Sequence, residues 1–446
     1  MWISSVSASP QPRSAAVLAS PWGVLLAAFL LQLPLSLNPG YFSHDELQWA
    51  HFAQAGVQVP WLDATTFQHR PLTFNLWMLL SRALFDTPML FHAVLVAWGS
   101  ANASLLYAVG RRFGMQTWPA LFGALVFALS PYAVYTHGWV GCIADLIWLS
   151  CALLLAWCVQ RIERAFVVVA VLASVLTAIA LLGKEAAFAI PPLLGVAWLF
   201  DGRKTKWLLA MLASGLVAAA YLGLRLDALL DAPREGPQYS LSVLHAPLRW
   251  LEYQLFPPIV PLVETFTTLQ RPLPAMIAGV LWLGLFAACW QASPRLAALF
   301  LLGGIAALLP VLPLATSFNH YAYGFAAITT ITLAAAWPQA SRWGRIAMAG
   351  FALLTVLHGA AVMWRMQQVG RMQAVFSPAL AAAVARDADV VLLQLSPDTT
   401  EWVIRRLTHD IPSYAGVAIG ARVRIVEPGQ PAEFIVQPDG SLHAAR

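Results

Sequence analysis

Long stretches of apolar residues recur along this chain, separated by short polar connections. A helix needs about 20 apolar residues to cross the roughly 30 Å hydrocarbon core of a bilayer. The stretches do not alternate between apolar and polar residues, as the strands of a membrane β-barrel would. The pattern therefore predicts about eleven membrane-spanning helices, which satisfy their own backbone hydrogen bonds in lipid. They cover residues 15–37, 88–109, 117–136, 139–159, 165–182, 185–200, 207–224, 273–290, 296–313, 321–337 and 346–364.

The composition supports the same interpretation. Apolar residues make up 59% of the 446 residues and charged residues only 11%. A soluble domain typically carries about 25% charged residues, so this chain lacks the polar surface to face water everywhere. Four cysteines lie inside apolar stretches, and we expect them to be buried hydrophobic residues rather than a disulfide framework or a metal cluster. They are Cys142, Cys151, Cys158 and Cys289.

The positive charges predict an orientation, because short cytoplasmic loops are enriched in Lys and Arg. If the N-terminus lies inside, every inner loop is short and basic. The basic residues of these loops are Arg111, Arg112, Arg161, Arg164, Arg203, Lys204, Lys206, Arg295, Arg342 and Arg345. The outer connections include two long segments, 38–87 and 225–272. We expect a bacterial inner-membrane protein whose outer segments face the periplasm, among membrane lipids and without a nucleic-acid partner.

The predicted fold class is an all-α polytopic membrane protein with a small C-terminal α/β domain outside the membrane. Residues 1–365 form the membrane domain, and an odd number of spans puts residues 366–446 on the outer side. Short strands are predicted at 390–395 and 434–437, and a helix at 400–408. The tail contains no catalytic motif, so we expect it to cover or support the outer face.

Two adjacent carboxylates, Asp45 and Glu46, come shortly after the first predicted span. Ser43 followed by Glu46 three residues later is typical of a capping box at the start of a helix. Neighbouring residues on a helix point about 100° apart, so Glu46 can cap the helix while Asp45 faces a cavity. A helix cap and a catalytic pair are therefore both compatible with this motif.

His69 and Arg70 open a short apolar segment at 71–85, which is typical of a helix lying in the membrane interface. A guanidinium at this position can bind a phosphate through two hydrogen bonds. The alternative for Arg70 is an arginine that reaches up to the lipid headgroups.

Asp145 lies about two turns into the fourth predicted span, counted from its outer end. An aspartate in a membrane helix costs roughly 2.5–3.5 kcal/mol on insertion scales, so it normally faces a cavity or a partner. A purely structural hydrogen bond between helices is the alternative interpretation.

Four further candidates lie at outer junctions. Lys184 and Glu185 form either a turn that neutralises its own charge or part of a binding site. His320 and Tyr321, followed by Tyr323, form either an aromatic belt at the interface or a wall of the same site. The predicted topology brings all these charged groups to the outer face, and titratable groups that converge in a cleft indicate a functional site.

These motifs resemble, in order and spacing, the polyprenyl-phosphate-sugar-dependent glycosyltransferases of the GT-C class. The resembling branch contains the protein O-mannosyltransferases and the lipid A aminoarabinose transferases, and the similarity covers residues 15–340. The motifs are "HDELQWA" with Asp45 and Glu46, "FQHRPL" with His69 and Arg70, "GCIADLIWL" with Asp145, "GKEAAFAIPPLL" with Lys184 and Glu185, and "NHYAYGFAAI" with His320 and Tyr321. Gln68 and His69 replace the acidic residue of the family motif, and Arg70 replaces its lysine.

The resemblance implies transfer of a sugar from a polyprenyl-phosphate donor to a protein, lipid or glycan acceptor outside the membrane, with inversion. A carboxylate must then accept the proton of the attacking hydroxyl, and Asp45 is the candidate base. Arg70 and Lys184 would stabilise the departing phosphate. Asp145 would position the acceptor or Arg70. Asp45 and Glu46 are the expected ligands of a divalent cation, Mg or Mn, if the enzyme uses one.

Two other classes of function fit the composition. The first is a transporter or flippase for a lipid-linked glycan, although such proteins usually place their site near the bilayer midplane within repeated halves. The second is a non-catalytic membrane scaffold that presents the outer tail to partners. The sequence has no convincing internal repeat, and its charged candidates lie near one face, which favours the transferase.

Overall fold

The computed structural model describes residues 20–63, 65–231, 239–255, 271–386 and 389–445. Residues 15–19 of the first predicted span lie outside this range. So do residues 232–238 and 256–270 of the second long outer segment.

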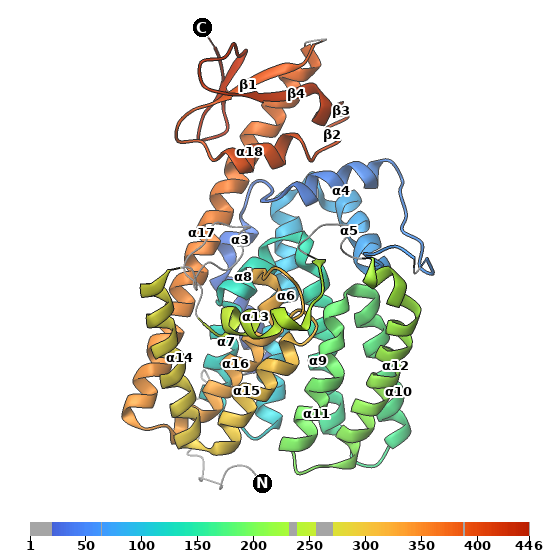
Figure 1. Ribbon diagram of the computed structural model, residues 1–446, viewed down its shortest axis with the longest axis vertical. Coiled ribbons are helices and arrows are strands. Elements are labelled where there is room, and N and C mark those ends of the chain that lie inside the picture. The colour runs from blue at the N-terminus through green and yellow to red at the C-terminus, as the bar shows by residue number, and fades with distance from the viewer. Residues whose placement is uncertain (1–19, 64, 232–238, 256–270, 387–388, 446) are drawn as a thin grey trace.

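Helices dominate the described chain (Figure 1). The first half contains α2 (Pro21–Leu31), α3 (Leu33–Ser36), α4 (His44–Gln54), α5 (Pro71–Leu84), α6 (Pro88–Arg112), α7 (Thr117–Ala128), α8 (Pro131–Gly138), η1 (Val140–Cys142), α9 (Ile143–Arg161), α10 (Phe166–Gly183), η2 (Glu185–Ala189), α11 (Ile190–Phe200) and α12 (Thr205–Leu230). The second half contains η5 (Val243–His245), α13 (Ala246–Gln254), α14 (Pro272–Ala292), α15 (Pro294–Leu308), η7 (Asn319–Ala322), α16 (Tyr323–Ala336), η8 (Trp337–Gln339) and α17 (Arg342–Arg386). The C-terminal domain contains β1 (Val391–Leu395), α18 (Glu401–Thr408), β2 (Ser413–Tyr414), β3 (Val417–Ala418), η9 (Gly420–Arg422), β4 (Val423–Val426), β5 (Phe434–Val436) and β6 (Leu442–Ala444).

Proline sets where many of these helices begin. It stands in the first turn of α2, α5, α6, α8, α14 and α15, where a missing N–H costs nothing. Between α7 and α8 the chain bends by 57°. Ser130 begins α8 by accepting a hydrogen bond from the N–H of Ala133 at 3.2 Å, directly before Pro131. The predicted span at 117–136 is therefore a broken helix.

The chain is an integral membrane protein. Within the described residues, six helices are long and apolar enough to cross a membrane, or seven if α7 and α8 count as one bent span. The six are α6, η1 with α9, α10, α12, α14 and α17. The remaining predicted segments are helical but short or interrupted, as in α2, η2 with α11, α15 and α16. The predicted number of about eleven spans is not confirmed.

The long outer segment and the tail lie at the same end of the helix bundle. Figure 1 shows α4, α5 and the C-terminal domain together at this end, and the connections α11–α12 and α14–α15 at the opposite end. One continuous cluster of buried apolar side chains runs from the bundle into the C-terminal domain, through Leu35, Met366, Phe376 and Ile404. The tail is thus packed onto the bundle.

The C-terminal domain is a small α/β unit, as predicted. Its sheet has the order β4-β1-β5-β6, with β1 parallel to β4 and β5, and β6 antiparallel to β5. α18 buries Val403, Ile404 and Leu407 against this unit. The predicted boundary at 365/366 falls inside α17, which continues to Arg386 before the first strand begins. This extension stays helical because its buried positions, such as Val369 and Phe376, continue the apolar face of the span.

A glycine pair on α17 tests this packing. A Cβ at Gly359 would lie 1.9 Å from the carbonyl oxygen of Leu129 at the break between α7 and α8, whereas a Cβ at Gly350 would meet nothing within 4 Å. Gly359→Ala should lower the stability of the detergent-solubilised protein by about 1–3 kcal/mol. Gly350→Ala should be neutral or slightly stabilising, because alanine favours the helix. Equal thermal unfolding midpoints for the two variants would contradict this packing.

Candidate active site

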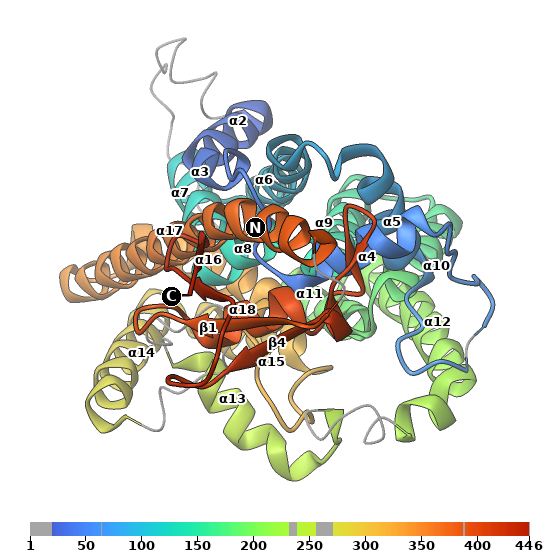
Figure 2. The same cartoon turned by 90° about the horizontal axis from the view of Figure 1, so that it is seen from above.

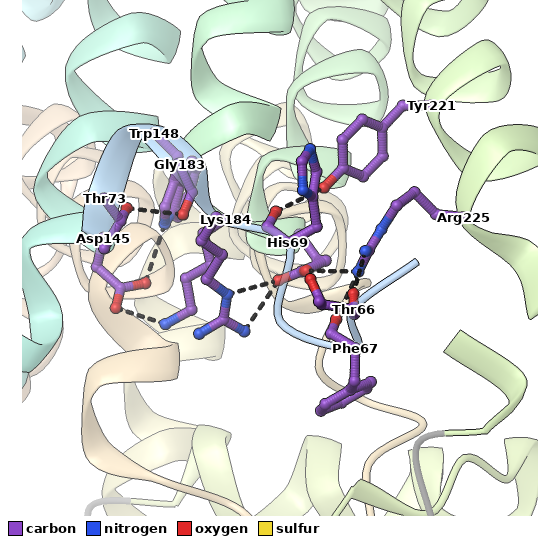
Figure 3. Close-up of polar contacts among 12 residues, drawn as sticks. Thr66, Phe67, His69, Thr73, Asp145, Trp148, Gly183, Lys184, Tyr221 and Arg225 are labelled. Carbon is purple, nitrogen blue, oxygen red and sulfur yellow. Dashed lines mark hydrogen bonds and ion pairs between the residues drawn. The ribbon is translucent and has the colours of Figure 1, made fainter. Parts of the chain in front are cut away.

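A buried ion pair joins the ends of two helices at the end of the bundle that carries α4, α5 and the C-terminal domain. The Lys184 ammonium, just after α10, donates to the carboxylate of Asp145 in the first turn of α9 at 2.6 Å (Figure 3). The two side chains are 6% and 1% exposed. The indole N–H of Trp148 donates to the other oxygen of Asp145 at 3.2 Å. The ring of Trp148 needs Gly324 opposite it, since a Cβ there would lie 2.2 Å away.

A second charged group begins one residue later. Glu185 accepts hydrogen bonds from Arg70, with both contacts at 2.9 Å. Its other oxygen lies 3.5 Å from Arg225 at the end of α12. Lys184 and Glu185 therefore have separate partners, and the interpretation of a self-neutralising turn is wrong. Arg70 is engaged inside the protein, not with solvent above lipid headgroups.

Arg225 also holds the loop that carries Arg70. Its guanidinium donates to the backbone carbonyls of Thr66 and Phe67, and Tyr221 on the same helix donates to the carbonyl of His69 at 3.2 Å (Figure 3). Arg225 is not among the site residues that the sequence predicts, since it was expected only to begin the outer segment 225–272. Its position in the helical repeat could have revealed that it is buried. Arg225 continues the buried face of α12 that is formed by Trp207, Ala210, Ser214 and Ala218.

His69 contributes to this group through its backbone more than its ring. The ring nitrogen Nδ1 is buried without a hydrogen-bond partner among the described residues. Burial lowers the pKa of His69, and the charge of Arg225 acts in the same direction. A neutral imidazole beside the Arg70–Glu185–Arg225 cluster can therefore accept or donate one further hydrogen bond.

Aromatic rings connect this charged cluster with the start of α4. The ring of Tyr321 lies 4.9 Å from the Lys184 ammonium, and His320 packs against Tyr321 at 4.4 Å. The ring centroid of His320 also lies 6.3 Å from that of Tyr135 and 5.6 Å from that of Trp139.

The rings of Tyr135 and Trp139 in turn contact Phe42, just before Ser43. We call Phe42, Tyr135, Trp139, His320 and Tyr321 the aromatic wall. Tyr323 lies deeper, fully buried against His137, so the interpretation of an interfacial belt does not describe these residues.

The two adjacent carboxylates on α4 have different surroundings. The predicted capping box is confirmed: Glu46 accepts the N–H of Ser43 at 3.2 Å, and it also accepts the N–H of Val140 at 3.2 Å. Burial raises the pKa of the Glu46 carboxyl to about 8, and the charge of Asp45 acts in the same direction. Asp45 is 18% exposed and accepts a hydrogen bond from the Ser43 hydroxyl at 3.1 Å. These contacts favour a structural role for Glu46 and leave Asp45 as the candidate base.

The groups on α4 and the buried ion pair meet around Cys142. Asp45, Glu46, Asp145 and Lys184 are all close enough to act electrostatically on its thiol. Arg70 likewise acts on Asp145. The structure thus brings Arg70, Lys184, Glu185, Asp145 and Tyr321 into one connected cluster, and Asp45 and this cluster both act electrostatically on Cys142.

The donor sets near this site differ in their fit to a cation. Both oxygens of Glu46 accept backbone N–H groups, so Asp45 and Glu46 do not fit the pair of cation ligands expected from the sequence. Among the described residues, ligand atoms of Cys142, Asp145 and His320 lie within 4.8 Å of one another. Lys184 already places a positive charge on that aspartate. A role for Mg or Mn stays a prediction.

The four cysteines are free, as expected, and Cys142, Cys151 and Cys289 are buried. Inside the bundle, an apolar cavity of about 260 Å³ extends between α6, α9, α11, α15 and α16. Its lining includes Leu149, Ile190 and Gly324. Each of these residues follows a residue of the cluster (Asp145, Glu185 and Tyr321, respectively) by less than two helical turns.

Comparisons with known proteins give a similarity of fold. No protein-family model matches the chain, and no curated protein is similar to it. One similar solved structure is the archaeal oligosaccharyltransferase AglB from Archaeoglobus fulgidus in complex with an inhibitory peptide and a dolichol-phosphate. Its TM-score is 0.46 and its identity 15%, over 90% of this chain and 64% of that chain.

Another similar structure is the Archaeoglobus fulgidus oligosaccharyltransferase tethered to an acceptor peptide containing the NVT sequon via a disulfide bond. Its TM-score is 0.46 and its identity 14%, over 93% of this chain and 65% of that chain. The chain thus spans less than two thirds of the length of either protein. At this degree of similarity no residue role is transferred from them.

Glu46 predicts a pH dependence of stability. A folded-state pKa above the ordinary value of 4.5 means that folding holds the proton more tightly, so this stabilisation is complete below about pH 4.5 and lost as pH rises through about 8. Between these values it falls by up to about 1.4 kcal/mol per pH unit. Glu46→Gln should show a flatter dependence of the thermal unfolding midpoint on pH than the wild type. The exposed Glu401→Gln is the control, and a wild-type slope in Glu46→Gln would contradict the assignment.

Proposed function

We propose that this protein is a membrane glycosyltransferase that transfers a sugar from a polyprenyl-phosphate donor to an acceptor at the outer face. The observation that carries the proposal is a cationic cluster at one end of a bundle whose interior holds an apolar cavity, lined in part by residues close in sequence to the cluster. Among the described residues, three cations, Arg70, Lys184 and Arg225, face two carboxylates, Asp145 and Glu185, which leaves one net positive charge. A sugar-phosphate-lipid diester carries one negative charge and an apolar tail, so it complements both parts.

The phosphate is expected to lie beside Arg70 and Lys184. Arginine binds phosphate oxygens through two parallel hydrogen bonds, and lysine adds a compact charge. Arg70 can turn toward a ligand without leaving Glu185 unpaired, because Arg225 remains beside that carboxylate. This arrangement avoids the cost of a buried charge without a partner.

The proposed reaction combines Asp45 with the cationic cluster, since Asp45 and Lys184 both act electrostatically on Cys142. An acceptor hydroxyl donates its proton to Asp45 as its oxygen forms a bond to the anomeric carbon. The bond between that carbon and the phosphate oxygen breaks, and the electron pair leaves with the polyprenyl phosphate. Arg70 and Lys184 stabilise the charge that develops on the phosphate. A single displacement from the opposite face inverts the anomeric centre.

The charged groups gather at one end of the bundle, which argues against a transport pathway with its site near the midplane. Mass spectrometry of envelope glycans from a deletion strain distinguishes the two functions. A transferase predicts loss of one specific sugar, whereas a flippase predicts accumulation of a complete lipid-linked precursor on the inner side.

Asp45→Asn should reduce transfer by about 100-fold to 10,000-fold, because the attacking hydroxyl loses its base. Transfer is measured with the purified protein in detergent or liposomes. Insertion and the thermal unfolding midpoint should stay close to wild type, since Asp45 is partly exposed and its neighbour Glu46 keeps the helix cap. Near-normal turnover by this variant, made at normal levels, would exclude Asp45 as the base.

Arg70→Ala should act mainly on the lipid donor. We expect an increase of about tenfold or more in the donor KM, as for loss of one charged hydrogen-bonding partner of a phosphate, with the acceptor KM unchanged. Arg70→Lys should restore part of the donor affinity, since it keeps the charge but loses the paired hydrogen bonds. An unchanged donor dependence in Arg70→Ala would contradict the phosphate role.

A further inference from the structure

The C-terminal domain contacts α4, the helix that carries Asp45, through two polar contacts. From α18, Arg406 donates from Nε to His44 Nδ1 at 3.0 Å, and its Nη2 lies 2.6 Å from the same nitrogen. Seven residues along α4, His51 Nδ1 lies 2.6 Å from the hydroxyl of Ser413 in β2. Seven residues are about two helical turns, so both histidines lie on the face of α4 that meets this domain. Seen from above in Figure 2, the domain lies over the middle of the bundle.

Arg406 contacts both ring nitrogens of His44. A guanidinium has only N–H donors, so Nδ1 accepts the hydrogen bond from Nε, while Nη2 also lies 3.3 Å from Nε2 and the Ser43 hydroxyl lies 3.2 Å from Nδ1. That Nε2 lies 3.5 Å from Oδ1 of Asp45, while the Ser43 hydroxyl occupies Oδ2. The chain of contacts therefore runs from Arg406 through His44 to the carboxylate of Asp45.

The guanidinium itself is held in place and is close to the site. It lies over the ring of Trp402 at 5.8 Å, one turn earlier on α18. Arg406 and Asp45 both act electrostatically on the hydroxyl of Tyr135 in the aromatic wall. The charged groups that face His44 are Asp45 on its own helix and Arg406 and Asp410 from the C-terminal domain.

We propose that the C-terminal domain is part of the catalytic apparatus, with Arg406 as a positioning residue that fixes His44 and, through it, the carboxylate of Asp45. The inference rests on the proposed role of Asp45 as base. It goes beyond that role, because it assigns the tail a function in turnover that no motif in its sequence indicates. The second contact, between Ser413 and His51, keeps the other end of α4 in the same position.

The test compares Arg406→Met with Arg405→Met in the full-length protein. Arg405 is the matched control, since it is the preceding residue on α18, is 53% exposed, and pairs only with Glu401 in the contacts described. Arg406→Met should lower kcat by about tenfold or more, because a displaced catalytic group loses rate steeply, and should leave both KM values within about twofold. Arg405→Met should leave both parameters unchanged. Arg406→Lys should recover part of kcat, since it can still donate to Nδ1.

A double-mutant cycle with His44→Phe distinguishes positioning from general support of the domain. If Arg406 acts through His44, the double variant should be no slower than His44→Phe alone. Additive losses in the double variant would overturn the inference. So would a loss that appears in KM, or a loss of activity that only matches the fraction of unfolded Arg406→Met and is not rescued by Arg406→Lys. Activity of Arg406→Met equal to wild type would do the same.

The inference and the proposed function fail in different ways. Active Asp45→Asn removes the function proposed for Asp45 and the inference with it. Inactive Asp45→Asn together with fully active Arg406→Met removes only the role of the C-terminal domain.

Discussion

The buried pair of Lys184 and Asp145 is the interaction on which the end of the bundle below the C-terminal domain depends. Each charge is nearly sealed from water, so each requires the other. Removing one partner of such a pair typically costs about 3–5 kcal/mol, because the remaining charge stays buried. The next residue, Glu185, points elsewhere and collects Arg70 and Arg225. A two-residue junction between α10 and α11 thus ties together α5, α9 and α12.

The same constraint explains why a ligand is expected there. Charges inside apolar surroundings are costly unless they are paired, and a cluster with one more cation than carboxylates can take up an anion without leaving that anion unpaired. The bundle also holds an apolar cavity, which a free inorganic anion would leave empty. An amphipathic anion satisfies both the charge and the cavity.

The sequence predicted the helical frame, the end of the bundle where the candidates gather, and the two strands and the helix of the tail. Hydrophobic stretches and loop charges carry that information directly. Their limits also explain the misses. Hydropathy does not reveal that Ser130 and Pro131 break a span, or that α16 is only 14 residues long, so the number of spans was not fixed. Arg225 was missed because the sequence predicted it to lie in a loop, although its spacing along α12 is that of the buried residues of this helix.

The ion pairs and hydrogen bonds between distant residues could not be predicted from the sequence, for a different reason. Lys184 and Asp145 were both expected at the outer end, but partners separated by 39 residues are chosen by helix packing, which no local pattern encodes. The contact between Arg406 and His44 spans 362 residues and joins parts of the chain that were expected to be separate domains. Side-chain chemistry could be predicted locally, whereas its combination required the fold.

Environment separates the two adjacent carboxylates that the sequence could not distinguish. Glu46 is 1% exposed with both oxygens occupied by backbone N–H groups, and a pKa of about 8 keeps it largely protonated at neutral pH. Two acidic groups with different surroundings commonly divide structural and catalytic roles. The helix cap that fixes Glu46 therefore also orients the first turn of α4, so that Asp45 is held from below by the bundle and from above by the C-terminal domain.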